Sequence, residues 1–264
     1  MRDWPAYRAL MLMGLRSVLA FRLSFAIGLL GSVFQLSASL ALWHVLDGGG
    51  GTVDGYSWPR IRTYLLVCFV CGVLVSNYAD LQMARRIRNG MVALDLTKPL
   101  DYQRSRFFET LGYSSAELLT AVGVLVIMAG LGGLYLPGGV HVALAVLSMA
   151  AVIPTKFVLV FASGLLCFWI QNYLGVNWTR VAISNLLSGA LLPLNFYPHW
   201  LATVASLLPF KGIASTPALI FSGDVDVPEA LSLVAEQWVW VVVLWFGARA
   251  WWSVASRRLT IYGG

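Results

Sequence analysis

Three cysteines are the residues best suited to redox or metal chemistry in this chain. Cys68 and Cys71 form the sequence CFVC, whose spacing is that of a redox pair, and Cys167 lies far from them. No Lys, Arg or His lies near the pair in sequence to stabilise a thiolate, and all three cysteines sit inside apolar runs. Buried cysteines usually behave as small hydrophobic side chains. The sequence therefore predicts a structural role for them and no metal site.

A serine nucleophile is a second possible source of chemistry, because Ser163 and Ser188 each precede a glycine. Such a serine needs a general base within hydrogen-bond reach. The three histidines, His44, His141 and His199, map to the outer ends of apolar segments or to outer loops. Ser-Gly pairs in apolar helices more often serve close helix packing. We therefore expect no intramembrane hydrolase and no catalytic residue.

Nucleotide binding by the chain itself is also excluded. A phosphate-binding loop reads GxxxxGK[ST], and none of the three lysines, Lys98, Lys156 and Lys211, follows a glycine. The chain is thus expected to bind no cofactor. Lys156 is unusual because it lies in an apolar run shortly after Pro154, where a charge is costly. A role in a transport path and a structural or snorkelling role both remain open for it.

The composition places these residues in a membrane protein. Apolar residues make up 59% of the 264 positions and charged residues 11%, whereas a soluble domain carries about 25% charged residues. Several charge-free blocks exceed the roughly 20 residues needed to cross a bilayer. The Lys and Arg residues are spread among the segments between these blocks, which does not favour nucleic-acid binding because that requires a contiguous basic surface.

The apolar blocks predict an all-α integral membrane protein with six transmembrane helices, in a single domain that covers residues 1–264. The expected crossings are residues 23–46, 61–83, 113–135, 141–170, a fifth between Arg180 and Pro193, and 230–252.

Two further segments complete the expected fold. In residues 5–22, three arginines share one third of a helix circumference, which indicates a helix lying in the membrane interface. Leu12, Leu15 and Leu19 fall among these arginines, so a lead-in to the first crossing is the alternative. Residues 194–229 follow the fifth crossing and contain Pro198 and Pro209, which a straight spanning helix does not accommodate. We expect short re-entrant helices there, on the outer side.

Charge asymmetry orients the expected topology. The N-terminal segment, the 84–112 loop, the turn near Arg180 and the C-terminal tail share one side and carry most Lys and Arg residues. The opposite side has Arg60, Arg62 and Lys211 together with several acidic residues. The positive-inside rule then places the basic side and both termini in the cytoplasm.

The cytoplasmic loop between the second and third crossings has its own pattern. Asn89-Gly90 breaks the preceding helix, about two helical turns with Met91, Val92, Leu94 and Leu96 follow, and Pro99 ends them. A short helix with apolar side chains, held off the membrane surface, is the expected form of a docking element for another protein.

These segments resemble the membrane subunits of ABC-2 type exporters, in particular the small six-span permeases that include viologen and antibiotic exporters. In the cytoplasmic loop, the matching residues are Ile87, Arg88, Gly90, Leu96, Pro99, Leu100 and Asp101. The run from Pro193 to Leu201, the run from Leu208 to Gly223 and the basic tail ending in Gly263-Gly264 also match.

The resemblance implies a non-catalytic permease of the bacterial plasma membrane. ATP and Mg²⁺ would bind a separate ATPase subunit, and two permease subunits, identical or sister chains, would form the pathway in contact with membrane lipid, without nucleic acid. The implied ATPase-coupling residues are Arg88, Asn89, Gly90, Met91, Leu94, Leu96, Lys98, Pro99, Leu100 and Asp101. The implied translocation-path residues are Phe34, Gln35, Trp43, Asn77, Tyr78, Asn185, Asn195 and Phe196, for each of which core packing is the competing explanation.

The expected function is ATP-driven export of an amphipathic or lipophilic compound, such as a drug, an antibiotic or a lipid-like molecule. The sequence leaves the substrate open. The alternative is an ion-coupled secondary multidrug transporter, which usually shows carboxylates or broken helices at midmembrane and repeated halves. Asp80 and Glu117 instead map near cytoplasmic ends, and the sequence shows no convincing internal repeat.

Overall fold

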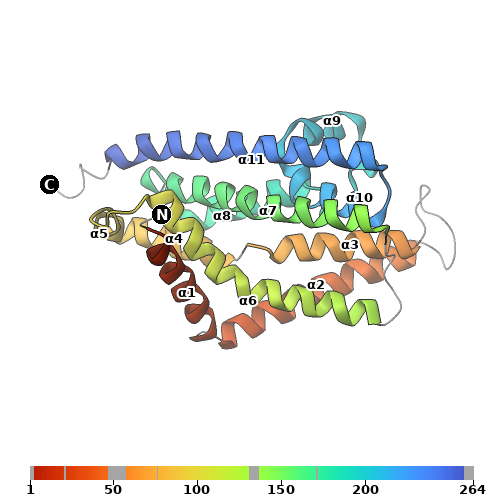
Figure 1. Ribbon diagram of the computed structural model, residues 1–264, viewed down its shortest axis with the longest axis horizontal. Helices are drawn as coiled ribbons and strands as arrows, with labels where there is room; N and C mark the ends of the chain where they lie inside the picture. Colours follow the sequence, from red (N-terminus) through yellow and green to blue (C-terminus); the bar gives the residue numbers. More distant parts are fainter. Residues whose placement is uncertain are drawn as a thin grey trace.

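A computed structural model describes residues 3–20, 22–46, 58–75, 77–130, 137–170 and 172–258, and every regular element in these ranges is a helix (Figure 1). The α-helices are α1 (Trp4–Ala20), α2 (Arg22–Leu46), α3 (Trp58–Val73), α4 (Asn77–Arg88), α5 (Met91–Leu96), α6 (Tyr102–Gly130), α7 (Gly139–Leu165), α8 (Tyr173–Leu187), α9 (His199–Leu207), α10 (Ser215–Ser222) and α11 (Val227–Ala255). Short 3-10 helices are η1 (Leu166–Phe168), η2 (Leu194–Phe196), η3 (Pro209–Ile213) and η4 (Ser256–Arg258).

The long helices lie roughly along one axis of the molecule, with α11 against α7 and α10 against α3. α5 lies at one end, together with α1 and the C-terminal end of α11, whereas α9 and α10 lie at the other end (Figure 1). Below, these are called the α5 end and the α10 end. One apolar core joins α3, α7, η3 and α10, and a second joins α4, α5, α6, α7 and α11.

Three helical segments among the described residues are long and apolar enough to cross a membrane: Ala26–Val45, Gly139–Phe168 and Val227–Ala255. They correspond to the first, fourth and sixth expected crossings. Pro154 lies inside α7, and the helix continues past it. α6 begins at Tyr102, eleven residues before the expected third crossing, and residues 131–135 of that crossing lie outside the described residues.

The fifth expected crossing differs from the structure. α8 has 15 residues, which at about 1.5 Å per residue is shorter than the ~30 Å hydrocarbon core. Arg180 lies within α8 and not in a turn, which corrects our placement of the second cytoplasmic turn. The helix begins earlier because the Asn172 side chain accepts a hydrogen bond from the Gly175 N–H at 3.2 Å. The Arg180 guanidinium is accommodated in the helix by Asn177 Oδ1, 2.8 Å away.

The second expected crossing is two helices, because α3 ends at Val73 and α4 begins at Asn77. A helix end leaves carbonyl groups without partners in the helix. Lys156 Nζ, from α7, donates to the carbonyl oxygen of Cys71 at 3.2 Å and also to that of Gly72. Lys156 therefore has a structural contact: its ammonium group caps the C-terminal end of α3 by pairing with two of the last carbonyl oxygens of that helix.

The segment between α8 and α11 is held at the α10 end by polar contacts with α3 and α11, and α11 is itself bonded to α7. The Tyr64 hydroxyl of α3 donates to the Gly189 carbonyl at 2.8 Å. The buried Gln237 amide of α11 donates to the carbonyl oxygens of Gly212 at 2.7 Å and of Ser148, in α7, at 3.0 Å. Lys211 pairs with Glu236 at 2.8 Å. These contacts satisfy backbone groups that the prolines of this segment leave outside a continuous helix.

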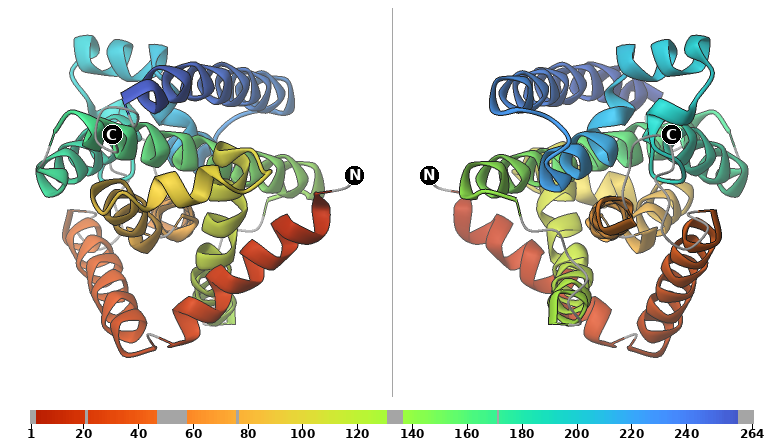
Figure 2. Two further views of the ribbon diagram at one scale, coloured as in Figure 1. Left: turned by 90° about the vertical axis from the view of Figure 1, so that its left-hand side faces the viewer. Right: turned by 90° about the vertical axis from the view of Figure 1, so that its right-hand side faces the viewer.

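α1 covers residues 5–20 of the interfacial segment expected at residues 5–22, whose last residue, Arg22, instead begins α2; α1 runs across α6 (Figure 2). The two helices cross where both carry glycine. A Cβ atom at Gly112 would lie 2.0 Å from the Met11 carbonyl oxygen, and one at Gly14 would lie 2.5 Å from the Glu109 carbonyl oxygen. Tyr7 stacks on Phe108, with ring centroids 5.0 Å apart. The crossing therefore depends on the absence of side chains at the two glycines.

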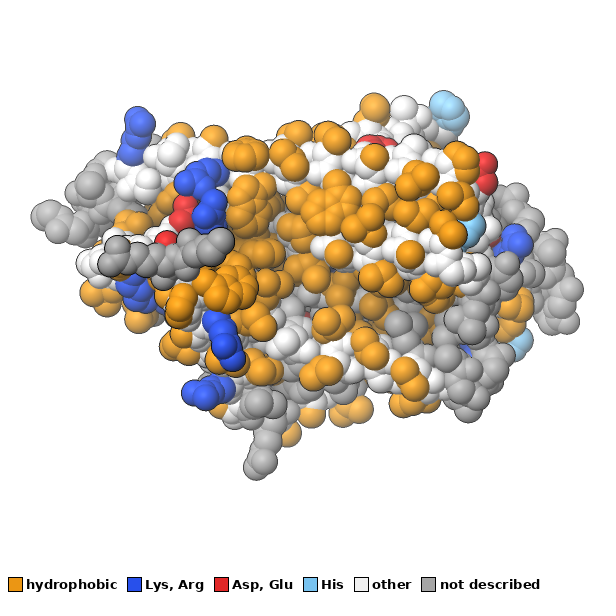
Figure 3. Space-filling model, in the orientation of Figure 1, with side chains coloured by type: hydrophobic (Ala, Val, Ile, Leu, Met, Phe, Trp, Pro, Cys, Tyr) orange, Lys and Arg blue, Asp and Glu red, His pale blue; other side chains and the backbone are white. Residues whose placement is uncertain are grey.

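Charged side chains are segregated on the face seen in Figure 3. Lys and Arg gather toward the α5 end, and apolar side chains cover the middle of the molecule. At the α10 end, Arg60 lies 3.5 Å from Asp224. This distribution is typical of a helical membrane protein with one basic flank.

Candidate functional site

The candidate site is built around α5, whose two ends are set by local sequence. Gly90 adopts a left-handed conformation, with φ of 68°, between the end of α4 and the start of α5. Glycine takes this conformation without steric cost. After α5, the Lys98 N–H bonds the Asp95 carbonyl at 3.3 Å, and Pro99 follows. A helix of 6 residues is marginal alone, so tertiary contacts must hold it.

α5 has one buried and one exposed face. Val92 is fully buried, and Asp95 is buried beside it. Met91, Leu94 and Leu96 point outward, and the Leu94 side chain is 64% exposed. Val92 was expected among the contact residues, and this is a correction: its side chain packs into the second apolar core. The exposed face thus carries three large apolar side chains, together with the small side chain of Ala93, at the α5 end of the molecule.

Buried ion pairs hold α5 against α4 and α6. Asp95 accepts hydrogen bonds from Arg86 of α4 at 3.0 Å and from Lys98 at 2.9 Å, and the Arg106 guanidinium of α6 lies 3.7 Å away. Glu109 pairs with Arg86 at 3.3 Å and also with Arg106. The Tyr113 hydroxyl donates to Glu109 at 2.9 Å. We call Arg86, Asp95, Arg106 and Glu109 the ion network.

The electrostatics of Asp95 follow from this geometry. Burial by itself raises the pKa of a carboxyl group. The hydrogen bond from Lys98 and the positive charges of Arg106 and Arg86 outweigh burial and lower the pKa of Asp95 below its ordinary value of 3.8. Asp95 is therefore ionised at neutral pH. Burial by itself would lower the pKa of Arg86, but the negative charges of Glu109 and Asp95 outweigh burial and raise it above its ordinary value.

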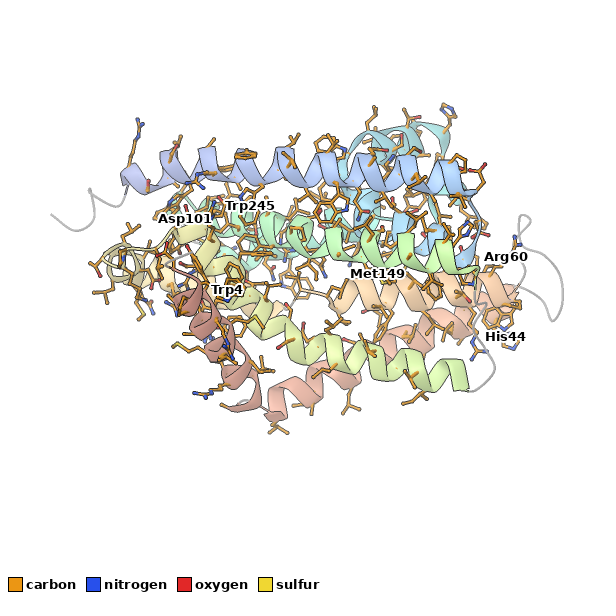
Figure 4. All side chains as sticks on the ribbon, viewed as in Figure 1. Trp4, His44, Arg60, Asp101, Met149 and Trp245 are labelled. Atoms are coloured by element: carbon orange, nitrogen blue, oxygen red, sulfur yellow. The ribbon has the colours of Figure 1, made fainter. Side chains whose placement is uncertain are left out.

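The segment after α5 is anchored to α11. Asp101 caps α6, because its Oδ1 accepts from the Arg104 N–H at 2.9 Å, and its Oδ2 lies 3.1 Å from Arg249. The Gln103 amide donates to the Trp245 carbonyl of α11 at 3.1 Å. Figure 4 labels Asp101 and Trp245, which lie near each other at the α5 end. α5 is thus held in place directly by α4 and α6, and the segment that follows it is held by α11.

Comparison with known families decides the kind of protein. The family described as ABC-2 family transporter protein matches residues 33–263. The chain belongs to this family. Its members are membrane transport subunits that normally work with ABC ATPase subunits. A search among curated proteins finds no significant match.

The remaining sequence-predicted coupling residues surround α5 in this ABC-2 family protein. Asn89, Lys98 and Pro99 are exposed, and Leu100 is half-buried. Arg88 is the last residue of α4, and its side chain lies outside the described residues. The ten predicted residues are therefore brought to one end of the fold. Asp101 differs from the exposed members because its carboxylate is already engaged within the chain.

The predicted translocation-path residues of this ABC-2 family protein fall in separate places. Phe34 and Gln35 lie in α2 and are both exposed, Phe34 to 77%. Trp43 is buried in the first apolar core, and its ring meets that of Phe196 edge-on at 5.3 Å.

Two amides and two residues of α4 complete this set. Asn185 is half-buried in α8, and Asn195 is exposed in η2. Asn77 and Tyr78 begin α4, and their side chains lie outside the described residues. Among the described side chains of this set, Trp43 and Phe196 pack together at the first apolar core, whereas Phe34, Gln35 and Asn195 are exposed.

Sequence reasoning missed the ion network of this ABC-2 family protein. Arg86 was counted only as part of the basic 84–112 loop, and Asp95, Arg106 and Glu109 were assigned no contact. One local signal was present, because Arg106 and Glu109 are three residues apart on one helix face. Asp95 and Lys98 are also three residues apart, but the other partners of Asp95, Arg86 and Arg106, come from α4 and α6 and gave no local signal.

Proposed function

We propose that this ABC-2 family protein is the permease subunit of an ATP-driven exporter and that α5 is the helix through which a separate ATPase subunit drives it. The observation that carries the proposal is the form of α5. It presents Met91, Leu94 and Leu96 to the outside while Asp95 fixes its other face through buried ion pairs. A partner surface would meet a helix that is already ordered, which reduces the entropy cost of binding.

The ion network suits α5 to transmit force. Arg86 and Arg106 bind both Asp95 of α5 and Glu109 of α6. A displacement of α5 by the partner would therefore be passed to α4 and α6, because separating these charges leaves them buried and unpaired. ATP and Mg²⁺ act on the partner subunit in this proposal.

A second permease subunit completes the proposed pathway. Only 12% of the apolar window in α2 is buried within this chain. In the proposed dimer, this surface faces lipid or the second subunit, and Phe34 and Gln35 of α2 line the path with Asn185 and Asn195. Aromatic and amide groups suit an amphipathic or lipophilic substrate. The positive-inside rule places the basic α5 end in the cytoplasm of a bacterial cell, with export directed toward the α10 end.

The test uses Leu94→Ser, which changes an exposed side chain and should leave the fold intact. Complete burial of a leucine contributes about 1.5–3 kcal/mol, so binding of the ATPase subunit to the permease in nanodiscs should weaken roughly 10-fold or more. Substrate-stimulated ATP hydrolysis should fall with it. The matched control is Leu231→Ser at the start of α11, a leucine that is 53% exposed.

The outcomes separate the candidate functions. Unchanged ATPase affinity in Leu94→Ser, or equal losses in both variants, would refute docking through α5. Transport by the purified chain alone, driven by an ion gradient and indifferent to ATP, would favour the secondary transporter.

A further inference from the structure

α1 presents a surface that the proposed docking of α5 does not explain. Arg8 and Arg16 are both exposed, and so are Trp4, Met11 and Met13. Cations and large apolar side chains therefore share the outer surface of one helix. A helix of this kind binds in the plane of the membrane interface, where apolar side chains enter the acyl region and arginines reach the headgroups. α1 also lies before residue 33, where the family match begins.

The location of α1 fits that surface. α1 runs across the bundle at the α5 end, as the end-on views in Figure 2 show. On the face in Figure 3, basic side chains form a band at this end, next to the apolar middle of the molecule. The band marks the level of lipid headgroups on one side of a bilayer, and the cytoplasmic leaflet is the anionic one. Charge complementarity thus identifies an anionic phospholipid surface as the partner.

α1 is connected to the ion network through the glycine crossing. Gly14 packs against the Glu109 backbone so closely that a Cβ atom would lie 2.5 Å from the Glu109 carbonyl oxygen. The Glu109 carboxylate binds Arg86 and Arg106, which both contact Asp95 of α5. Close-packed backbones transmit displacement with little slack, because no flexible side chain separates them. The path from α1 to α5 therefore contains one helix crossing and one layer of ion pairs.

We infer that α1 binds anionic phospholipid through Arg8 and Arg16 and that this binding stabilises α5 in the position described above. The consequence for transport rests on the proposed function, because α5 is the proposed ATPase contact. Binding by α1 holds α6 against the membrane surface, and the ion network holds α5 on α6. An anionic inner leaflet then becomes a condition for an ordered docking helix.

The first experiment measures lipid binding by the full chain alone, without any ATPase. Binding of phosphatidylglycerol to the purified protein in detergent is measured by native mass spectrometry for wild type, Arg8→Gln/Arg16→Gln and Arg8→Lys/Arg16→Lys. Each arginine near a headgroup contributes about 1 kcal/mol, so the glutamine variant should bind roughly 30-fold more weakly. The lysine variant, which keeps both charges, should bind like wild type. Equal affinity of the glutamine variant and wild type would overturn the inference.

The second experiment measures the effect on α5. Amide hydrogen exchange over residues 91–96 is compared in nanodiscs of phosphatidylcholine alone and of phosphatidylcholine with phosphatidylglycerol. Exchange should slow in the anionic discs for wild type and for the lysine variant, and should be the same in both discs for the glutamine variant. Slowing that persists in the glutamine variant would place the lipid effect elsewhere, and no slowing in wild type would refute transmission to α5. Neither result depends on ATPase docking, so failure here and failure of the proposed function are distinguishable.

Discussion

The glycine crossing of α1 and α6 leads to a quantitative prediction for Gly112→Ala. The added Cβ atom would lie 2.0 Å from the Met11 carbonyl oxygen and 2.9 Å from its carbonyl carbon. Contacts of a Cβ atom below 3.0 Å are essentially never seen. The atoms it meets belong to the backbone of α1, so no side-chain rotation relieves the clash. α1 must withdraw from α6 by about 1 Å, which also loosens the packing of its neighbours.

The expected cost follows from two opposing effects. Overpacking against rigid backbone costs about 1–3 kcal/mol. Replacing glycine by alanine inside a helix gains up to about 1 kcal/mol. A Cβ atom added at Gly123, in the same helix, would meet no described atom within 4 Å beyond the backbone of its own helix, so Gly123→Ala isolates the second effect. Because the two effects oppose each other, we expect Gly112→Ala to be about 1–3 kcal/mol less stable than Gly123→Ala, which should itself be slightly more stable than the wild type.

The assay is thermal unfolding of the purified chain in one detergent, with the wild type and both variants measured side by side. For a chain of this size, that difference corresponds to a Tm of Gly112→Ala that lies roughly 2–12 °C below that of Gly123→Ala. Trp4 of α1 lies edge-on to Phe108 of α6, with ring centroids 5.7 Å apart. Loss of this ring contact would therefore show that α1 has moved away from α6. If Gly112→Ala unfolds at the same temperature as Gly123→Ala, the close crossing is not present and the reasoning is refuted.

Three further predictions concern charged side chains. Asp95→Ala leaves Arg86 and Arg106 short of a counter-charge and should destabilise the chain by about 3 kcal/mol. Urea unfolding measures this loss, with Thr97→Ala on the exposed surface as the control. Equal destabilisation by the two substitutions would contradict the ion network. Because the pKa of Asp95 is lower in the folded protein, its contribution to stability is complete above its unfolded pKa of about 4 and is lost as pH falls through the folded pKa. Asp95 should therefore cause no change in the free energy of unfolding between pH 7 and pH 5. Lys156→Met should lower the free energy of unfolding by about 1–3 kcal/mol, because it leaves the last carbonyl groups of α3 unpaired. Lys156→Arg should restore part of that stability in the same thermal assay. A Lys156→Met variant as stable as the wild type would show that this contact is dispensable.

Local rules account for much of what could be predicted. The apolar blocks at residues 23–46, 141–170 and 230–252 correspond to helices long and apolar enough to cross a membrane, because bilayer thickness sets a length that can be read directly. Gly90 lies between α4 and α5, as its backbone freedom suggests. By contrast, the break between α3 and α4 has no proline or glycine within residues 74–76 and could not be read from such rules.

Prediction failed where partners come from distant elements. Val92 has the same character as its neighbours in sequence, yet it faces the core because Asp95, on the same side of α5, is drawn to Arg86 and Arg106. Which face of a six-residue helix is buried depends on these partners. One further failure was local: the Asn172 side chain, which accepts from the Gly175 N–H, marks the start of the helix that encloses Arg180, and this cap was overlooked.

By itself, the sequence determined that this chain is an all-helical membrane protein of the ABC-2 type, because hydropathy, segment length and a few short motifs are local properties. Only the tertiary structure decided that Gly14 meets Gly112, that Lys156 closes α3 and that Asp95 joins α5 to α4 and α6. These contacts depend on how close two backbones approach and on which charges share a buried space. Both are set by the packing of the whole chain, since residues far apart in sequence supply the two sides of each contact.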